Sequence, residues 1–213
     1  MIANPELNQG CEFDMRLYYA RSSPFARKVR IAAHELALSG CIELIEVDPW
    51  SSSELRSLNP LSKVPTLAIG AGPALYESNV ICEFLDSLNP EFALHPPQGE
   101  ERWRALLLQG LADGASTAAG RLYAAEHRAD AERSPVMMKR FQSAIEATLD
   151  RLETSRCLEP DITIGVVSVA AFTGYLDFRW PDRDWRLNRP YLSEWSELFS
   201  KRSSMTSTEH TQL

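Results

Sequence analysis

The chain has 213 residues, 44% of them hydrophobic, and a formal net charge of −7 at pH 7. That hydrophobic content can build a sizeable core, which excludes an intrinsically disordered chain. The acidic balance argues against a nucleic-acid-binding protein, because such a protein presents a basic face. No apolar run is long enough to span a bilayer, and the first residues lack the pattern of a secretory signal, so no membrane partner is expected.

The first elements along the chain predict a β-α-β unit. Residues 1–14 show no useful periodicity, and we interpret them as a flexible extension. A strand over 16–20 is followed by a helix over about 24–38 and by a second strand over 42–47. The crossover between the two strands should be right-handed.

The next segments predict a hairpin and a second helix. Residues 51–57 are polar and favour a short helix, whereas strands near 66–69 and 74–77 flank the turn Gly70–Pro73. A helix then closes the domain, and the order βαβ followed by ββα is the thioredoxin-like plan. Five apolar side chains are expected on its inward face: Val80, Ile81, Phe84, Leu85 and Leu88.

The second half of the chain is predicted to be all helical. Residues 90–99 contain three prolines and are interpreted as a linker between a domain over 15–89 and a helical domain over 100–213. The nearly continuous apolar run over 162–178 predicts the central buried helix. Three further helices are expected to direct these side chains inward or towards another helix: Trp103, Leu107, Gly110, Leu111, Gly114 and Ala118 in the first, Met137, Phe141, Ile145, Thr148 and Leu152 in the second, and Tyr191, Trp195, Leu198 and Phe199 in the last.

The cysteines and histidines give no sign of a metal site. Cys11, Cys41, Cys82 and Cys157 are isolated and follow no metal or redox spacing, and the four histidines are scattered. Cys82 falls on the apolar face of a predicted helix and is expected to be buried. The pattern indicates a reducing, cytoplasmic compartment and a protein without metal.

The most informative residues lie where the first strand meets the first helix. Pro24 suits the first helical position, because its φ is preset and its missing N–H would have gone unused there. Ser23 is then the natural N-cap, next to unpaired backbone N–H groups that favour an anion such as a thiolate. The residues alone leave two readings open, a purely structural cap and an anion site. Arg27, Lys28 and Arg30 are assigned to a solvated surface.

Two further corners, where the chain enters or leaves a predicted strand, also combine a constrained backbone with groups that could bind a ligand. Val64-Pro65 precedes a short apolar strand, where a proline often marks a constrained and sometimes cis turn. Glu77-Ser78 ends the next strand and begins another helix, where polar ligand groups can be held.

These three corners, in this order and at this spacing, resemble the N-terminal domain of the cytosolic glutathione S-transferases. Ser23–Ala26 takes the place of the thioredoxin-like Cys-x-x-Cys, Val64-Pro65 that of the cis-proline corner, and Glu77-Ser78 that of the γ-glutamyl clamp. The resemblance covers about residues 15–205 and implies a thioredoxin-like domain followed by an all-α bundle.

The second half supports the resemblance. Tyr175–Arg179, Asp184–Arg186 and Arg189-Pro190 look like the bacterial branch of this family. The sequence departs from the family pattern at the start of the central helix, where the usual capping box has an Asp and this chain has Val166. Thr163 can still provide the first half of that box.

The resemblance also implies roles for particular residues. Ser23, with the adjacent Ser22 as its rival, would donate a hydrogen bond to the sulfur of glutathione; Tyr18 and Tyr19 are less favoured donors. The other glutathione contacts implied by the resemblance are Lys63, Val64, Pro65, Glu77 and Ser78, with Arg56 a weaker candidate.

The implied function is glutathione transfer to a small hydrophobic electrophile, in a cytoplasmic homodimer with a role in detoxification. Three alternatives remain open at this point: a non-catalytic binding or scaffold protein of the same fold, a glutathione-dependent isomerase or dehalogenase, and a thiol oxidoreductase. The last would need Cys at position 23, where this chain has Ser23.

Overall fold

A computed structural model describes residues 14–89, 92–158 and 161–211, so the predicted extension over 1–14 lies almost wholly outside the described residues. The chain divides into two compact units. The first contains the described residues up to Leu94 together with residues 207–211, and the second contains the described residues of His95–Thr206. The sequence pattern assigns residues 207–211 to the helical domain, but they belong to the first unit.

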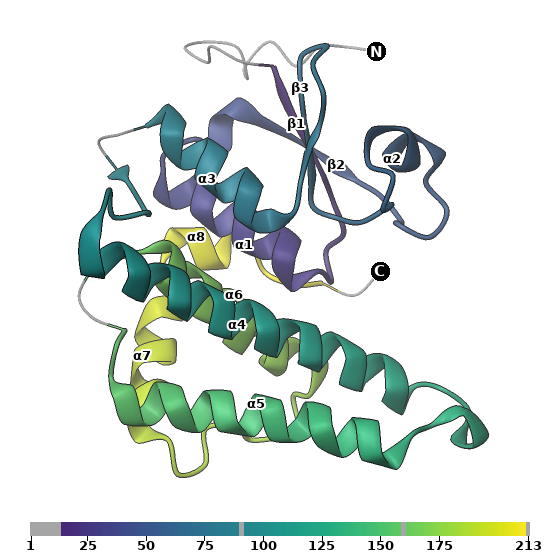
Figure 1. The fold of residues 1–213 in the computed structure, drawn as a ribbon, viewed down its shortest axis with the longest axis vertical. Coiled ribbons are helices and arrows are strands. Elements are labelled where there is room, and N and C mark those ends of the chain that lie inside the picture. The colour runs from purple at the N-terminus through teal and green to yellow at the C-terminus, as the bar shows by residue number, and fades with distance from the viewer. Residues whose placement is uncertain (1–13, 90–91, 159–160, 212–213) are drawn as a thin grey trace. The chain divides into compact units, whose positions relative to one another are not determined.

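The first unit is built on a four-stranded mixed sheet in the order β2-β1-β3-β4 (Figure 1). The strands are β1 (Met15–Tyr19), β2 (Ile42–Glu46), β3 (Thr66–Ile69) and β4 (Leu75–Tyr76). β1 is parallel to β2 and antiparallel to β3, and β3 is antiparallel to β4. The β-α-β unit and the hairpin predicted from the sequence are both present.

The helices of this unit are α1 (Pro24–Glu35), α2 (Ser53–Leu58) and α3 (Ser78–Leu88), with the short 3₁₀ turn η1 (Ser39–Cys41). α1 and α3 pack against each other, and α2 packs against β3. Figure 1 shows α1 and α3 together on one side of the sheet and α2 on the other.

The alternation of side chains along β1 explains this layering. Leu17 faces α1, where it lines a cavity with Ala33. The next residue, Tyr18, points to the opposite face and packs with Leu55 of α2 and with Ala68. Because successive residues of a strand face opposite sides, one short strand supplies both halves of the core. The unit is the thioredoxin-like domain that the sequence predicts.

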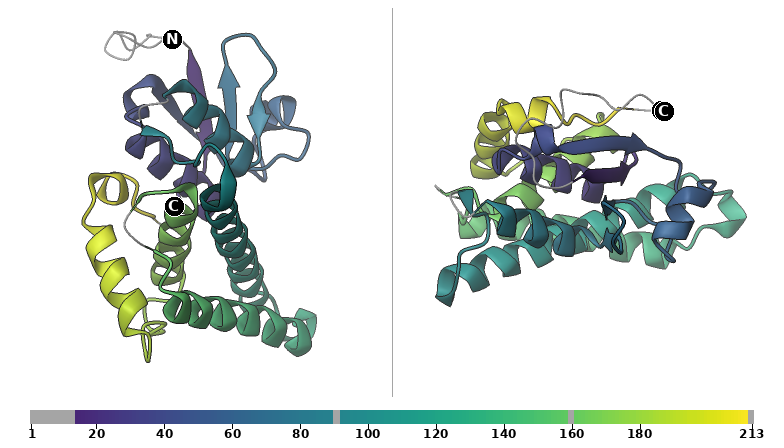
Figure 2. Two further views of the ribbon diagram at one scale, coloured as in Figure 1. Left: turned by 60° about the vertical axis from the view of Figure 1, so that its left-hand side comes forward. Right: turned by 90° about the horizontal axis from the view of Figure 1, so that it is seen from above.

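The second unit is all helical (Figure 2). Its helices are α4 (Gly99–Glu126), α5 (Pro135–Ser155), α6 (Ile164–Arg179), α7 (Pro190–Ser200) and α8 (Ser203–Thr206), with the 3₁₀ turn η3 (Asp130–Glu132). α4 packs against both α5 and α6. Most of α6 is buried, so the prediction of a central buried helix over 162–178 is confirmed.

The start of α6 combines a cap with a very close helix contact. The Thr163 hydroxyl accepts a hydrogen bond from the Val166 N–H at 3.4 Å, which is the half of the capping box that the sequence retains. A Cβ added to Gly165 would lie 2.6 Å from the Ala105 carbonyl oxygen and 2.8 Å from the Leu108 Cβ of α4. Gly165 therefore lets the backbones of α4 and α6 approach more closely than any side chain would permit.

Several burial assignments made from helical periodicity were wrong. Periodicity predicts inward positions for Val80, Met137 and Leu198, but all three are exposed. The sequence pattern predicts a solvated surface for Arg27 and Lys28, but both are buried. Burial also lowers the pKa of the Arg30 guanidinium below its ordinary value. The first helix therefore buries cationic side chains that the sequence had placed in water.

The cysteines follow the expectation only in part. Cys82 is a buried thiol, as predicted, and Cys157 is an exposed thiol. Cys41 is disulfide-bonded, which the isolated spacing of the cysteines did not lead us to expect.

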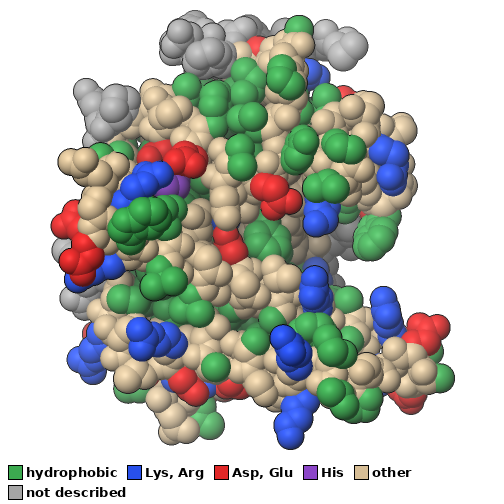
Figure 3. Space-filling model, viewed as in Figure 1, with side chains coloured by type: hydrophobic (Ala, Val, Ile, Leu, Met, Phe, Trp, Pro, Cys, Tyr) green, Lys and Arg blue, Asp and Glu red, His purple; other side chains and the backbone are tan. Residues whose placement is uncertain are grey.

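The surface of the described residues carries side chains of both charges (Figure 3). Acidic and basic side chains are interspersed on the face of the molecule shown in Figure 3. Within the described ranges, no helix combines the length and hydropathy needed to cross a membrane. The same residues contain no group of three or more His, Cys, Asp or Glu side chains placed to hold a metal ion.

Candidate functional site

The register of the sheet brings the three predicted corners to one end of it. Tyr18 of β1 is paired with Thr66 of β3, which in turn is paired with Tyr76 of β4. β1 leaves this row towards Ser23, β3 enters it from Val64-Pro65, and β4 leaves it towards Glu77-Ser78. Because both pairings are antiparallel, all three corners lie at the same end of the sheet.

Ser23 is the N-cap of α1. Its Oγ accepts a hydrogen bond from the Ala26 N–H at 3.2 Å, and Pro24 occupies the first position of the helix. None of the described residues accepts the proton of the Ser23 hydroxyl. The hydroxyl therefore keeps a donor for a ligand while its oxygen is fixed by the cap, and it lies at the positive end of the helix dipole.

Ser22 lies in the turn just before the cap. The Ser23 N–H donates to the Ala20 carbonyl at 3.0 Å, which closes a turn with Arg21 and Ser22 at its two central positions. Both serines are half-buried. Only the Ser23 oxygen takes part in the helix cap, so its position is the better fixed of the two.

The tyrosines of β1 are occupied elsewhere. The Tyr18 hydroxyl donates to Glu54 Oε1 at 2.6 Å, and Tyr18 is buried. Burial first, and then the hydrogen bond to Glu54, raise the pKa of Tyr18 to about 12. Tyr19 packs under Arg30, whose guanidinium carbon lies 5.0 Å from the centre of the ring. Both tyrosines therefore serve the packing of the domain.

The second corner has main-chain groups without hydrogen-bond partners among the described residues. The Val64-Pro65 peptide bond is cis, as the sequence suggested. None of the described residues forms a hydrogen bond with the N–H or C=O of Val64. A free N–H and a free C=O on one residue can pair with a peptide as an added strand would.

A buried asparagine that the sequence analysis missed holds this corner in place. Asn59 is 1% exposed, and its side-chain amide donates to the Lys63 carbonyl at 3.1 Å and to the Thr66 Oγ1 at 3.0 Å. Its Oδ1 accepts from the Leu61 N–H at 2.9 Å. The signal was present in the sequence, because Asn followed by Pro at a helix end is typical of a structured turn.

The third corner has an unusual backbone. Glu77 has φ 69° and ψ 121°, and its side chain makes no capping hydrogen bond to α3. A residue other than glycine in such a conformation costs on the order of 1–3 kcal/mol, and conformations of this kind cluster at functional sites. Glu77 is exposed and Ser78 is buried at the first position of the helix, so a carboxylate and the N–H groups of a helix start are presented together.

A buried lysine, also missed, adds positive charge beside this helix start. Lys28 is 1% exposed, and its ammonium donates to the Oδ1 of Asn79, the second residue of α3, at 2.6 Å. The sequence does not reveal this burial, because a charged residue on a helix normally lies on its solvated face. Lys63 and Arg56, the predicted partners of a carboxylate, are both exposed.

A protein-family model and a known bacterial protein are both similar to this chain. A model of the glutathione S-transferase N-terminal domain matches residues 22–88. The uncharacterized GST-like protein YibF of Escherichia coli K12 is 30% identical over 200 residues, which cover 92% of this chain and 98% of YibF.

Two solved structures are similar over nearly their whole length. A glutathione transferase family member from Pseudomonas fluorescens Pf-5, solved with bound glutathione, is 33% identical with a TM-score of 0.89 and covers 93% of this chain and 100% of that chain. A glutathione S-transferase from Methylobacterium radiotolerans, solved with glutathione sulfonate, is 32% identical with a TM-score of 0.86 and covers 93% of this chain and 96% of that one.

Proposed function

Because the chain belongs to the glutathione S-transferase family, we propose that it binds glutathione at the sheet end formed by the three corners and activates its thiol for attack on a small hydrophobic electrophile. The observation that carries this proposal is the Ser23 hydroxyl, whose oxygen caps α1 while its proton remains available within the described structure. The solved relatives with bound glutathione and glutathione sulfonate support the choice of ligand.

The chemistry of the thiol explains why such a hydroxyl matters. A free thiol of the cysteine type has a pKa of about 8.5, so only a few per cent is thiolate at neutral pH. A hydrogen bond donated to the sulfur favours the charged form and lowers that pKa. Ser23 would act as this donor and not as a nucleophile, and the nearby N–H groups of α1 add to the same effect.

The remaining contacts follow from the shape of the tripeptide. The free main-chain groups of Val64, held beside Pro65, would pair with its cysteinyl part. Glu77 would hold the γ-glutamyl ammonium, and Ser78 at the start of α3 the adjacent carboxylate. The buried Lys28 ammonium adds a positive charge near that carboxylate, and Lys63 would meet the glycyl carboxylate.

The clamp is tested by Glu77→Gln and Ser78→Ala. Each should weaken glutathione binding about tenfold or more, because loss of a charged hydrogen-bond partner costs about 1.5–3 kcal/mol. Gln keeps the length of the side chain, so the first variant isolates the charge. Calorimetric titration with glutathione measures the affinity.

The matched control is Ser87→Ala, at the far end of the same helix, where the hydroxyl only donates to the Phe84 carbonyl. It should leave the affinity unchanged. Equal affinity in all three variants would remove Glu77 and Ser78 from the site. Retention of the wild-type chain on immobilised glutathione without turnover of any electrophile would instead indicate a binding protein.

We further propose that the protein is a homodimer. Trp103 is 69% exposed and Leu107 is 76% exposed on α4, and a Cβ added to Gly110 or Gly114 would meet nothing within 4 Å. Helical spacing puts these four residues on one outward stripe, where the two glycines would let a partner helix approach closely.

Sedimentation should therefore give about twice the chain mass of 23.9 kDa at micromolar concentration. Leu107→Lys should convert the protein to a monomer, because a charge would be buried in the interface. Leu198→Lys is the control, since Leu198 is 62% exposed on a different helix. A wild-type chain that sediments as a monomer would refute the dimer.

The proposal includes a cytoplasmic location and a role in detoxification. Glutathione is kept reduced in that compartment, and a serine-type site needs the thiol form of its co-substrate. The disulfide at Cys41 is the observation that stands against this location.

A further inference from the structure

We propose that residues 207–211, which we name the strap, hold the turn that carries Ser22 and Ser23, and that His210 is the positioning residue within it. This inference rests on the proposed function, because it assigns a role to the strap in the activation of glutathione. The strap belongs to the same compact unit as the turn, although the two are almost two hundred residues apart in the chain.

His210 contacts the turn directly. Its Nδ1 lies 2.8 Å from the Arg21 carbonyl oxygen, and because a carbonyl can only accept, the Nδ1 carries the proton and donates it. The Arg21 guanidinium in turn donates a hydrogen bond to the Thr211 Oγ1 at 3.4 Å. Arg21 is also tied to the end of β2 by an ion pair with Glu46 at 2.7 Å.

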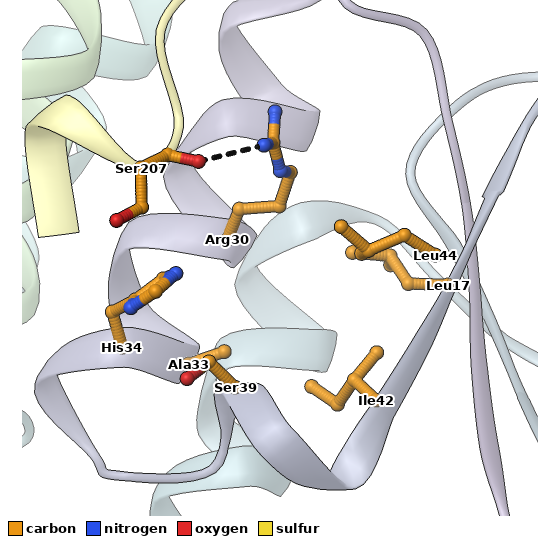
Figure 4. A pocket seen from close by; sticks show the side chains of 8 residues that line it. All are labelled: Leu17, Arg30, Ala33, His34, Ser39, Ile42, Leu44 and Ser207. Atoms are coloured by element: carbon orange, nitrogen blue, oxygen red, sulfur yellow. Dashed lines mark hydrogen bonds between the residues drawn. The ribbon is translucent and has the colours of Figure 1, made fainter. Parts of the chain in front are cut away.

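The other end of the strap is anchored on α1. The Arg30 guanidinium donates to the Ser207 carbonyl at 3.1 Å, as Figure 4 shows, and Thr208 is 1% exposed. Beneath Ser207 lies a cavity of about 60 Å³, with an apolar wall from β1 and β2. The strap is therefore attached at both ends, to Arg30 of α1 and to Arg21 in the turn.

The Arg21 carbonyl, which accepts the hydrogen bond from His210, belongs to the peptide whose orientation defines the type of turn. Arg21 and Ser22 are the central residues of the turn closed by the Ser23 N–H and the Ala20 carbonyl. The two common turn types differ mainly by a flip of the peptide between the central residues, and the flipped form needs a positive φ at the second of them. Ser22 has no positive φ. The hydrogen bond from His210 fixes this peptide and with it the approach of the chain to Ser23.

Loss of the strap contact should affect the rate of the reaction and not the affinity for glutathione. The strap contacts Arg21 and Arg30, whereas the proposed binding groups at Val64, Glu77 and Ser78 lie on other segments. Loosening the turn should therefore impair the orientation of the Ser23 hydroxyl more than the affinity for glutathione. A lower kcat with an unchanged KM for glutathione is the signature of that loss.

The test compares His210→Ala with His210→Asn in the full chain. The Asn amide can donate from nearly the position of Nδ1, so it should rescue what Ala removes. Glu209→Ala, an exposed neighbour in the strap, is the control. Hydrogen exchange of the unliganded protein reports on the turn, and kcat, KM and the pKa of the bound thiol report on its chemical effect.

For His210→Ala we expect exchange in residues 20–26 to rise about five- to tenfold, as for the loss of one hydrogen bond. We also expect kcat to fall by about the same factor, the thiol pKa to rise and KM to stay unchanged. His210→Asn should return the exchange rate, kcat and the thiol pKa to their wild-type values.

Wild-type exchange and kcat in His210→Ala, with an active wild-type enzyme, would overturn the role of the strap alone. A kcat loss that Asn does not rescue would overturn the assignment to the Nδ1 hydrogen bond. A wild-type chain that does not bind glutathione would overturn the proposed function itself and this role with it.

Discussion

Replacement of Ser23 by Ala should lower the rate of glutathione conjugation by about 10- to 10³-fold, the range found when a hydrogen bond to a stabilised charge is removed. The thiol of bound glutathione should also titrate at a higher pH, because its thiolate loses its donor. The rate is measured with a broadly reactive aromatic electrophile, and the thiolate by its ultraviolet absorbance across pH.

The same substitution also removes the cap of α1, which is worth about 0.5–2 kcal/mol, so stability has to be separated from chemistry. Ser23→Asp provides that separation, because Asp caps a helix well but places a negative charge where the thiolate should lie. It should keep the thermal midpoint and lose the activity. Ser22→Ala is the second control. Full activity in Ser23→Ala together with loss in Ser22→Ala would move the donor to Ser22.

Gly165→Ala should destabilise the helical unit by about 1–3 kcal/mol, since the new methyl group would overlap the backbone of α4. The overlap involves the Ala105 carbonyl oxygen at 2.6 Å, which cannot move without shifting the helix. For a chain of this size the thermal midpoint should fall by about 2–12 °C, as followed by circular dichroism.

Gly120→Ala is the matched control on α4. A Cβ there would meet only the Tyr175 hydroxyl, at an ordinary 3.8 Å. This variant should be more stable than the wild type by up to about 1 kcal/mol, because Ala favours a helix over Gly. A Gly165→Ala protein that melts at or above the wild-type midpoint would show that α4 and α6 are not in such close contact.

The sequence predicted the elements and the location of the three corners well. Hydrophobic periodicity and the turn residues Gly70–Pro73 identified the strands and the hairpin, and Ser23-Pro24 identified the start of α1 with its cap. These signals are local, so they can be recognised in the sequence without knowing which distant segments pack against them.

What the sequence did not predict depends on contacts between distant segments. Lys28 is buried because Asn79, 51 residues later, accepts its hydrogen bond, and no periodicity within α1 reveals that partner. Asn59 gains its importance from the carbonyl and hydroxyl groups that the following turn brings to it. The strap lies outside helices and strands altogether, so its attachment to Arg21 leaves no pattern in the residues.

The shared row Tyr18–Thr66–Tyr76 also determines where the chain can change in length. The turn between β3 and β4, over Gly70–Ala74, lies at the end of the hairpin opposite Val64 and Glu77. Extra residues or a reporter peptide inserted there would lengthen the turn while the pairing of Thr66 stays in place, and loop length alone costs little free energy. An insertion between Asn59 and Thr66 would instead separate the asparagine from the groups it holds. The hairpin tip is therefore the suitable attachment point for a label, and the segment before β3 should be left at its natural length.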